Sequence, residues 1–306
     1  MTLKDTLLGL FIIVIWGVNF VVIAWGLDGI PPLLMGAERF LLVALLGSFI
    51  IKKPDIPWRW LALYALTIAF GQFAFLFSAM AFGMPAGLAS LVLQSQAIFT
   101  LIFAALFLKE GIKPLQIVAM LVAGGGLYII GATQQNTTMT GLGFGLTIAG
   151  AVCWASGNII NRLINQRGYQ VDTGLIIWSS WIPPIPFLMA SFYFEGQEQI
   201  IASIVGMQWT SFAALFYLAI AASIIGYTSW SYLLSRYPAA QVAPLTLGVP
   251  VDGLASASLL LNETMSDQQI IGIGLVLIGL LVNSFSRQIS SVLQKAGIKK
   301  ASRVND

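Results

Sequence analysis

The amino-acid sequence predicts an all-α integral membrane protein with ten transmembrane helices, arranged as two inverted repeats of five helices. Three observations lead to this fold class. Apolar residues make up 58% of the 306 residues and charged residues only 9%, whereas soluble proteins average about 25% charged residues. The apolar residues gather into ten segments, and the basic residues fall almost entirely on one side of the resulting topology. Ten spans of about 20 residues occupy roughly 200 residues, which leaves only short loops and a tail.

The ten apolar segments follow one another with short connections. Because lipid offers no hydrogen-bond partner to a free backbone group, each segment is expected to be a helix. The first segment is too long for the apolar region of a signal peptide and lacks a cleavage site of small residues, so it counts as a span. In chain order the predicted spans are 6–26, 32–51, 60–81, 85–108, 114–131, 141–163, 173–194, 209–235, 239–261 and 268–286.

The lysine and arginine residues predict the orientation of the chain. Fourteen of the fifteen fall at the termini or in loops on one side of the membrane, and the other side has none. Since cytoplasmic loops carry an excess of basic residues, we expect both termini in the cytoplasm and the protein in the cytoplasmic (inner) membrane. The fourteen are Lys4, Lys52, Lys53, Arg59, Lys109, Lys113, Arg162, Arg167, Arg236, Arg287, Lys295, Lys299, Lys300 and Arg303.

The chain repeats itself at a constant offset of 153 residues, which aligns residues 64–126 with residues 217–279. We therefore divide it into a first five-helix repeat at 6–131 and a second at 141–286. An odd number of spans inverts the second repeat relative to the first, an architecture common among secondary transporters. Equivalent residues in the two repeats include Pro85 and Pro238, Leu101 and Leu254, Ala104 and Ala257, and Glu110 and Glu263.

Composition excludes several kinds of chemistry. The sequence has no histidine, which argues against Ser-His or Cys-His nucleophilic pairs and His-ligated metal sites. Its single cysteine, Cys153, allows no internal disulfide and no CxxC motif. The sequence contains no GxxxxGK[ST] loop for ATP. We expect no metal, no cofactor, no nucleic-acid partner and no enzymatic activity.

Several stretches of the sequence match a known family. They are Trp16-Gly17-Val18-Asn19-Phe20, Pro31-Pro32 with Arg39, Pro85 to Ser90, Leu108-Lys109-Glu110 and Leu261-Asn262-Glu263. On these stretches the sequence resembles the drug/metabolite transporter superfamily, EamA type, over all ten spans. Three further stretches, Gln72 to Phe77, Gly83 to Gln94 and Val242-Ala243-Pro244-Leu245, look close to the O-acetylserine/cysteine exporter branch of that family. The resemblance implies ten helices around a central cavity and the export of small metabolites.

Polar side chains inside the spans are the candidate site residues, because each is costly in lipid and must face protein or water. Together with aromatic residues they predict a cavity suited to a small zwitterion or an uncharged polar metabolite. Interhelical hydrogen bonding is the competing interpretation for each of them. The predicted substrate-binding residues are Trp16, Asn19, Arg39, Gln72, Gln94, Trp154, Asn158, Tyr227 and Trp230. Gln94 and Gln96 lie two residues apart on a helix, so only one of them is expected to face the cavity.

Three charged residues lie well inside predicted spans, away from their ends. Asp252 lies near the middle of its span, with Ser256 one turn further on the same face. We expect Asp252 to exchange a proton, to bind a substrate amine or to be a structural carboxylate. Arg39 matches the arginine of the family in the second span, and either holds a substrate carboxylate or braces neighbouring helices. Glu38 would neutralise Arg39 or carry a proton, so Glu38 and Asp252 are the candidates for proton coupling.

Two regions are expected to have other roles. The fifth and tenth spans have few polar side chains but many glycines, including Gly124-Gly125-Gly126. Since small residues permit close backbone packing, these spans are interpreted as scaffold helices or as the contact of a homodimer, with the monomer as the alternative. The tail at 287–306 alternates apolar and basic residues, which predicts an amphipathic helix on the anionic lipid of the cytoplasmic leaflet.

These observations predict a secondary transporter that works by alternating access. The resemblance implies that it exports small metabolites, with amino acids or derivatives of the cysteine pathway, such as cysteine and O-acetylserine, as the expected substrates. The driving force would be the proton gradient or the gradient of the substrate itself. A broad-specificity efflux carrier for drugs or aromatic compounds is the alternative, and a metabolite channel is the alternative from a different class.

Overall fold

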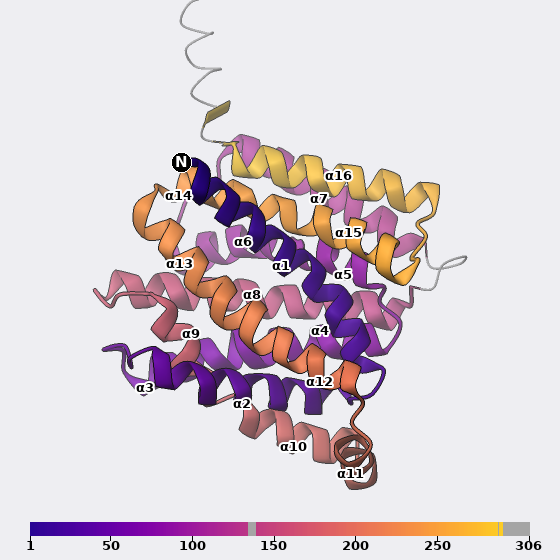
Figure 1. Ribbon diagram of the computed structural model, residues 1–306. Coiled ribbons are helices and arrows are strands. Elements are labelled where there is room, and N and C mark those ends of the chain that lie inside the picture. The colour runs from indigo at the N-terminus through magenta and orange to yellow at the C-terminus, as the bar shows by residue number, and fades with distance from the viewer. Residues whose placement is uncertain (134–138, 287, 290–306) are drawn as a thin grey trace, which may run out of the picture.

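The computed structural model describes residues 1–133, 139–286, 288 and 289, with the backbone alone at 239 and 240. This part of the chain is a bundle of roughly aligned helices and contains no strand (Figure 1). Nine helical stretches in it are long and apolar enough to cross a membrane, and a bent pair of helices makes the tenth. The prediction of an all-α membrane protein with ten spans is confirmed.

In the first half, two of the long helices begin at a proline residue. Pro32 and Pro114 are the first residues of their helices, where the missing N–H of proline costs nothing. The third and fourth spans each contain a short irregular segment. The elements are α1 (Leu3–Leu27), α2 (Pro32–Ile50), α3 (Trp58–Tyr64), the π-helix η1 (Ala65–Gly71), α4 (Gln72–Ala81), α5 (Ala86–Val92), the 3₁₀ turn η2 (Leu93–Ser95), α6 (Gln96–Leu108) and α7 (Pro114–Ala132).

The second half has the same order with one addition, a short helix in the loop after the seventh span. That span is bent by 42° between its two helices, at Pro183 and Pro184, which lack backbone donors. The elements are α8 (Gly141–Gln166), α9 (Thr173–Ser179), α10 (Pro184–Phe194), α11 (Gln197–Val205), α12 (Trp209–Phe216), the π-helix η3 (Tyr217–Ile225), α13 (Gly226–Arg236), α14 (Ala239–Val242), the 3₁₀ segment η4 (Ala243–Leu247), α15 (Gly248–Leu261) and α16 (Asp267–Ser284).

Irregular backbone recurs at equivalent places in the two halves. The third and eighth spans both contain a π-helix, and the fourth and ninth both contain a 3₁₀ segment. Lys109, at φ 56°, and Asn262, at φ 54°, both end their helices in the left-handed conformation, and they are separated by the offset of 153. A left-handed residue is costly unless it is glycine or asparagine, so its repetition marks two copies of one helix ending.

The helices α7 and α16 pack against each other along one edge of the bundle (Figure 1). A Cβ atom added at Gly126 would meet the carbonyl oxygen of Gly272, and one added at Gly279 would meet that of Ala119. The small residues of the fifth and tenth spans therefore serve the contact between these two spans. Gly124 has open space at its Cβ position, so part of the glycine-rich face points away from the bundle.

The largest hydrophobic core lies between α1, α2, α4, α5 and the inward faces of the second half. The N-terminus and the described end of α16 lie at the same end of the bundle, which we call the terminal end (Figure 1). The predicted amphipathic tail at 287–306 lies almost wholly outside the described residues, so it remains a prediction.

Candidate functional site

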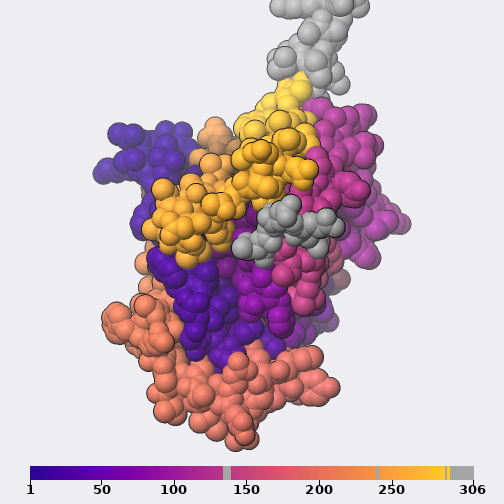
Figure 2. All heavy atoms as spheres, turned by 90° about the vertical axis from the view of Figure 1, so that its right-hand side faces the viewer, coloured from indigo at the N-terminus to yellow at the C-terminus, as the bar shows by residue number. Residues whose placement is uncertain are grey.

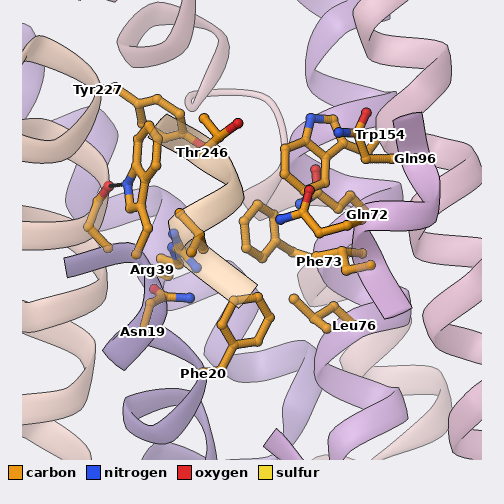
Figure 3. Close-up of a pocket in the computed structure, with 15 residues that line it drawn as sticks. Asn19, Phe20, Arg39, Gln72, Phe73, Leu76, Gln96, Trp154, Tyr227 and Thr246 are labelled. Carbon is orange, nitrogen blue, oxygen red and sulfur yellow. Dashed lines mark hydrogen bonds between the residues drawn. The ribbon is translucent and has the colours of Figure 1, made fainter. Parts of the chain in front are cut away.

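A cavity of about 160 Å³ lies in the middle of the bundle and is lined by residues from both halves (Figure 3). Since about 10–15 Å³ of such volume holds one water molecule, the cavity has room for a small metabolite. Aromatic rings and neutral amides form most of its wall. The lining residues are Trp16, Asn19, Phe20, Arg39, Gln72, Phe73, Leu76, Leu93, Gln94, Gln96, Trp154, Ala222, Tyr227, Thr246 and Val249.

Irregular helix segments border this cavity on several sides. Gln72 and Phe73 directly follow η1, Leu93 and Gln94 belong to η2, and Thr246 belongs to η4. Such segments weaken the regular i to i+4 hydrogen-bond ladder and are frequent at hinges and functional sites. The spans that carry them are therefore the ones able to bend at the cavity.

The π-helix η3 also supplies a hydrogen-bond acceptor at the cavity wall. The indole Nε1 of Trp16 donates to the carbonyl oxygen of Ala222 at 2.9 Å, which fixes the orientation of the indole. The Trp16 ring lies 5.3 Å from that of Tyr227 and 5.5 Å from that of Trp230. These three rings form one aromatic cluster on the side of the cavity opposite Trp154.

Seven of the nine predicted substrate-binding residues line the cavity, namely Trp16, Asn19, Arg39, Gln72, Gln94, Trp154 and Tyr227. The structure places the other two behind its wall. Trp230 supports Trp16, and the Asn158 amide nitrogen donates to Gln96 Oε1 at 2.9 Å and to Thr100 Oγ1 at 3.1 Å. Both therefore position lining residues.

The expectation that only one of Gln94 and Gln96 faces the cavity is wrong, because both line it. On an α-helix, residues i and i+2 are separated by about 200° around the helix axis. The 3₁₀ turn η2, however, covers Leu93–Ser95 and advances about 120° per residue. The local change of winding brings the two side chains toward a common side.

Arg39 lies where both interpretations left open by the sequence would place it, and the structure shows the bracing contact. Its Nη2 donates to Ser223 Oγ at 3.2 Å, which braces α2 against η3, and its side chain also lines the cavity. The guanidinium carbon lies 4.3 Å from the centre of the Phe73 ring. Glu38 makes no ion pair with Arg39 and does not line the cavity. The expectation that Glu38 neutralises Arg39 is therefore wrong, because adjacent residues on a helix lie about 100° apart.

Asp252 lies at the contact between α15 and α1, outside the lining of the cavity. A Cβ added at Gly17 would overlap the Asp252 carboxylate, so the two residues are in direct contact. The hydroxyl of Ser256 donates to Asp252 Oδ2 at 3.4 Å. The carboxylate is therefore half-buried at a helix contact and does not line the cavity.

The sequence reasoning missed several lining residues. Phe20 and Phe73 lie inside the stretches that carried the family resemblance. The sequence contains many apolar aromatic residues, and nothing in it distinguished these two as cavity-lining. Thr246 had two usable signals, because it is a polar residue beside Pro244 and is equivalent to Leu93 at the offset of 153. Gln96 and Val249 are a second equivalent pair in the lining.

The two ends of the bundle differ in how they are closed. At the end opposite the termini, residues 88–93 are all buried. The equivalent residues at the terminal end are 241–246, and among them only Val242 is buried. The Glu263 carboxylate accepts hydrogen bonds from the backbone N–H of Ala86 at 2.6 Å and of Gly87 at 3.0 Å. Figure 2 looks onto this end and shows the orange and yellow atoms of α15 and α16 beside the purple atoms of the first half.

The equivalent glutamate at the terminal end has a different partner. Glu110 forms an ion pair with Arg162 at 2.8 Å, in which both side chains are about half exposed. The cavity is therefore sealed by packed backbone at one end and is flanked by partly exposed helix at the other.

A membrane bundle of ten spans in two related halves, with one central cavity bordered by broken helices, is the architecture of a secondary transporter. The chain belongs to the EamA-like transporter family, whose model matches residues 4–132 and 141–285. It is 44% identical over 299 residues to a "Probable amino-acid metabolite efflux pump" of Salmonella typhimurium, covering 97% of this chain and 100% of the relative. A protein of Escherichia coli with the same description is 45% identical over 287 residues, covering 93% of this chain and 96% of the relative.

More distant comparisons agree with this fold. An "Uncharacterized inner membrane transporter" of Escherichia coli is 25% identical over 285 residues, covering 90% of this chain and 89% of the relative. A solved crystal structure superimposes with a TM-score of 0.63 at 19% identity, covering 94% of this chain and 99% of that chain. The family and its relatives are transporters, so the chain is a multi-pass membrane protein of the exporter type for small metabolites.

Proposed function

We propose that the protein exports amino acids or their derivatives across the cytoplasmic membrane by alternating access. The observation that carries this proposal is the central cavity, whose size, single arginine and amide groups suit a small polar metabolite. The efflux description of the relatives at 44% and 45% identity supports the direction of transport. Cysteine and O-acetylserine are the first substrates to test, because three stretches of the sequence resemble that exporter branch.

The structure corresponds in this proposal to the inward-open state of the cycle. A Cβ added at Gly87 would contact Ala257 and Glu263 at 3.2 Å and Leu254 at 3.3 Å, so α5 and α15 pack closely at the end opposite the termini. The lysine and arginine residues of the loops are predicted to lie on the same side of the membrane as the termini. Because cytoplasmic loops carry an excess of basic residues, this supports placing the termini, and hence the open end, in the cytoplasm.

The outward-open state would exchange the two ends. Leu101, Ala104 and Glu110 are equivalent to the residues that contact Gly87, and they line a separate cavity of about 100 Å³ at the terminal end. In the other state the segment after Pro238 would fill this cavity, and Glu110 would leave Arg162 to accept hydrogen bonds from that backbone. A carrier that exchanges such contacts between its halves follows the alternating-access scheme of inverted repeats.

Transport into inside-out membrane vesicles tests the function, with and without a proton gradient. The panel contains cysteine, O-acetylserine, phenylalanine and a cationic dye. We expect saturable uptake of at least one amino-acid compound, and acceleration by a proton gradient if coupling occurs. Saturable uptake of the dye alone would favour a broad-specificity efflux carrier. Flux that does not saturate would favour a channel and would overturn alternating access.

The packing of small residues between α7 and α16 bears on the oligomeric state. Because these helices already pack against each other through Gly126 and Gly279, we propose a monomer as the transporting unit. The outward faces of the same helices remain available for a homodimer, which a molecular-mass measurement in detergent would reveal.

A further inference from the structure

Arg39 is a buried cation whose hydrogen-bonding capacity is mostly unused. The residue is 3% exposed, and its guanidinium donates the one hydrogen bond to Ser223 while Nε and Nη1 have no partner. The ring of Phe73 beneath it offers a cation–π contact but no acceptor for these N–H groups. An arginine carries five N–H donors in a planar fork, so most of them are free.

Among the described residues, no carboxylate forms an ion pair with Arg39. The ion pairs within the described residues join Arg162 to Glu110 and Arg236 to Asp5, and neither involves Arg39. A buried donor without a partner is destabilising by about 1–3 kcal/mol, and more when it is charged. An anion that binds between the spans would relieve this cost, and the fork of a guanidinium matches the two oxygens of a carboxylate.

Arg39 lines two cavities, and their sizes decide where such an anion binds. The side cavity, next to Tyr64, Ser179 and Ser180, has a volume of about 20 Å³, enough for about one or two water molecules. The central cavity is about eight times larger at 160 Å³. A metabolite therefore enters from the central cavity, and its carboxylate meets Arg39 at the wall that the two cavities share.

The central cavity offers nothing that requires a positive charge on the ligand. Its lining among the described residues contains no acidic side chain. The Oδ1 atom of Asn19 is buried without a hydrogen-bond partner, and an amide oxygen can accept from an ammonium group or from the N–H of an amide. The site can therefore recognise the nitrogen of a ligand without recognising its charge.

We propose that Arg39 anchors the carboxylate of the ligand and that the site does not require a free amine. This inference rests on the proposed function in that the central cavity is the substrate site. It defines the ligand class as carboxylates of amino-acid size, with the amine either free or acylated. Amino-acid amides have lost the carboxylate but keep the free amine, so they carry a net positive charge. The site would exclude such compounds.

Binding to purified protein in detergent tests this class directly, with tryptophan fluorescence as the readout because Trp16 and Trp154 line the cavity. The probes are two matched series, phenylalanine with N-acetylphenylalanine and phenylalaninamide, and cysteine with N-acetylcysteine and cysteinamide. In at least one series we expect the free and acetylated acids to bind with similar affinity and the amide about 10- to 100-fold more weakly, the loss expected for charge-assisted hydrogen bonds.

Two variants separate anchoring from bracing. Arg39→Gln should weaken binding of both acids by the same factor and remove the preference over the amide, whereas Ser223→Ala removes only the brace and should keep that preference. If Arg39→Gln does not fold, the probe series on the native protein decides alone. The proposal would be overturned if the amide bound as tightly as the acids. It would also be overturned if the free amino acid bound and the acetylated acid did not, or if neither acid bound in either series.

The outcomes also distinguish this inference from the proposed function. Binding of both acids without saturable vesicle transport would contradict export and leave the anchor intact. Saturable transport of amides at a rate independent of Arg39 would contradict the anchor and leave export intact.

Discussion

Replacing Glu263 by glutamine removes the charge of the carboxylate that closes the end opposite the termini. In the structure both carboxylate oxygens accept backbone hydrogen bonds, from Ala86 and Gly87, and the negative charge lies at a helix N-terminus, where it is favourable. Glutamine keeps one acceptor and places an NH₂ group against the second N–H. Because the side chain is half exposed, we expect a loss of about 1–2 kcal/mol, or roughly 5- to 30-fold in the equilibrium between closed and open states.

The rate of thiol labelling measures this equilibrium. Ser90 is buried one turn beyond Gly87, and Ser90→Cys in a Cys153→Ala background puts a thiol of similar size behind the closed end. An impermeant maleimide added from that side should label it roughly 5- to 30-fold faster when Glu263→Gln is also present. The matched control is Glu198→Gln, an exposed acid on α11 of the same end. Unchanged labelling in a folded Glu263→Gln protein, or an equal increase in the control, would refute the closing role.

Two further predictions concern topology and the cavity walls. With single cysteines at Gln197→Cys and Lys53→Cys in turn, an impermeant reagent on intact cells should label only the first, and labelling of the second would contradict cytoplasmic termini. Trp154→Ala should lower ligand affinity with little change in melting temperature, whereas Trp16→Ala should lower both, because Trp16 also bonds to the carbonyl of Ala222. A melting temperature that falls equally in both tryptophan variants would argue for packing roles alone.

Much of the fold could be predicted because its physical signals are strong and local. Each span must satisfy its own backbone in lipid, so length and hydropathy were enough to find ten spans. The left-handed endings at Lys109 and Asn262, which the sequence did not predict, are separated by the same offset of 153 residues. The bend in the seventh span coincides with Pro183 and Pro184, which carry a recognisable chemical signal.

The details of the site depend on features that have no such local signal. The sequence analysis did not predict the π-helices and 3₁₀ turns, and the turn at Leu93–Ser95 changes the winding that relates Gln96 to Gln94. The pairing of Asn158 with Gln96 joins residues 62 positions apart, so spacing along one helix could not assign it. The sequence therefore found most of the polar residues of the site, though not Thr246, and could not tell which of them contact the cavity and which support it.

Asp252 is the remaining candidate for coupling transport to protons, together with Glu38. Its position between α15 and α1, beside Gly17 and Ser256, weakens the substrate-amine interpretation, because the carboxylate does not line the cavity. A protonation change at a helix contact could still alter how α15 moves against α1, and α15 is part of the closed end. Asp252→Asn keeps the size of the side chain and an acceptor for the Ser256 hydroxyl but cannot titrate.

If Asp252 exchanges protons during the cycle, the Asp252→Asn protein should bind substrate and exchange it across the membrane at a near-normal rate, but a proton gradient should no longer accelerate efflux. If the residue is structural, the variant should keep its response to the gradient and show at most a lower melting temperature. Measuring counterflow and gradient-driven uptake in the same vesicles separates the two outcomes, with Glu38→Gln assayed in parallel. Gradient-driven transport that persists in a folded Asp252→Asn protein and fails in Glu38→Gln would move the coupling site to Glu38, and persistence in both would exclude coupling through an acidic side chain within the spans.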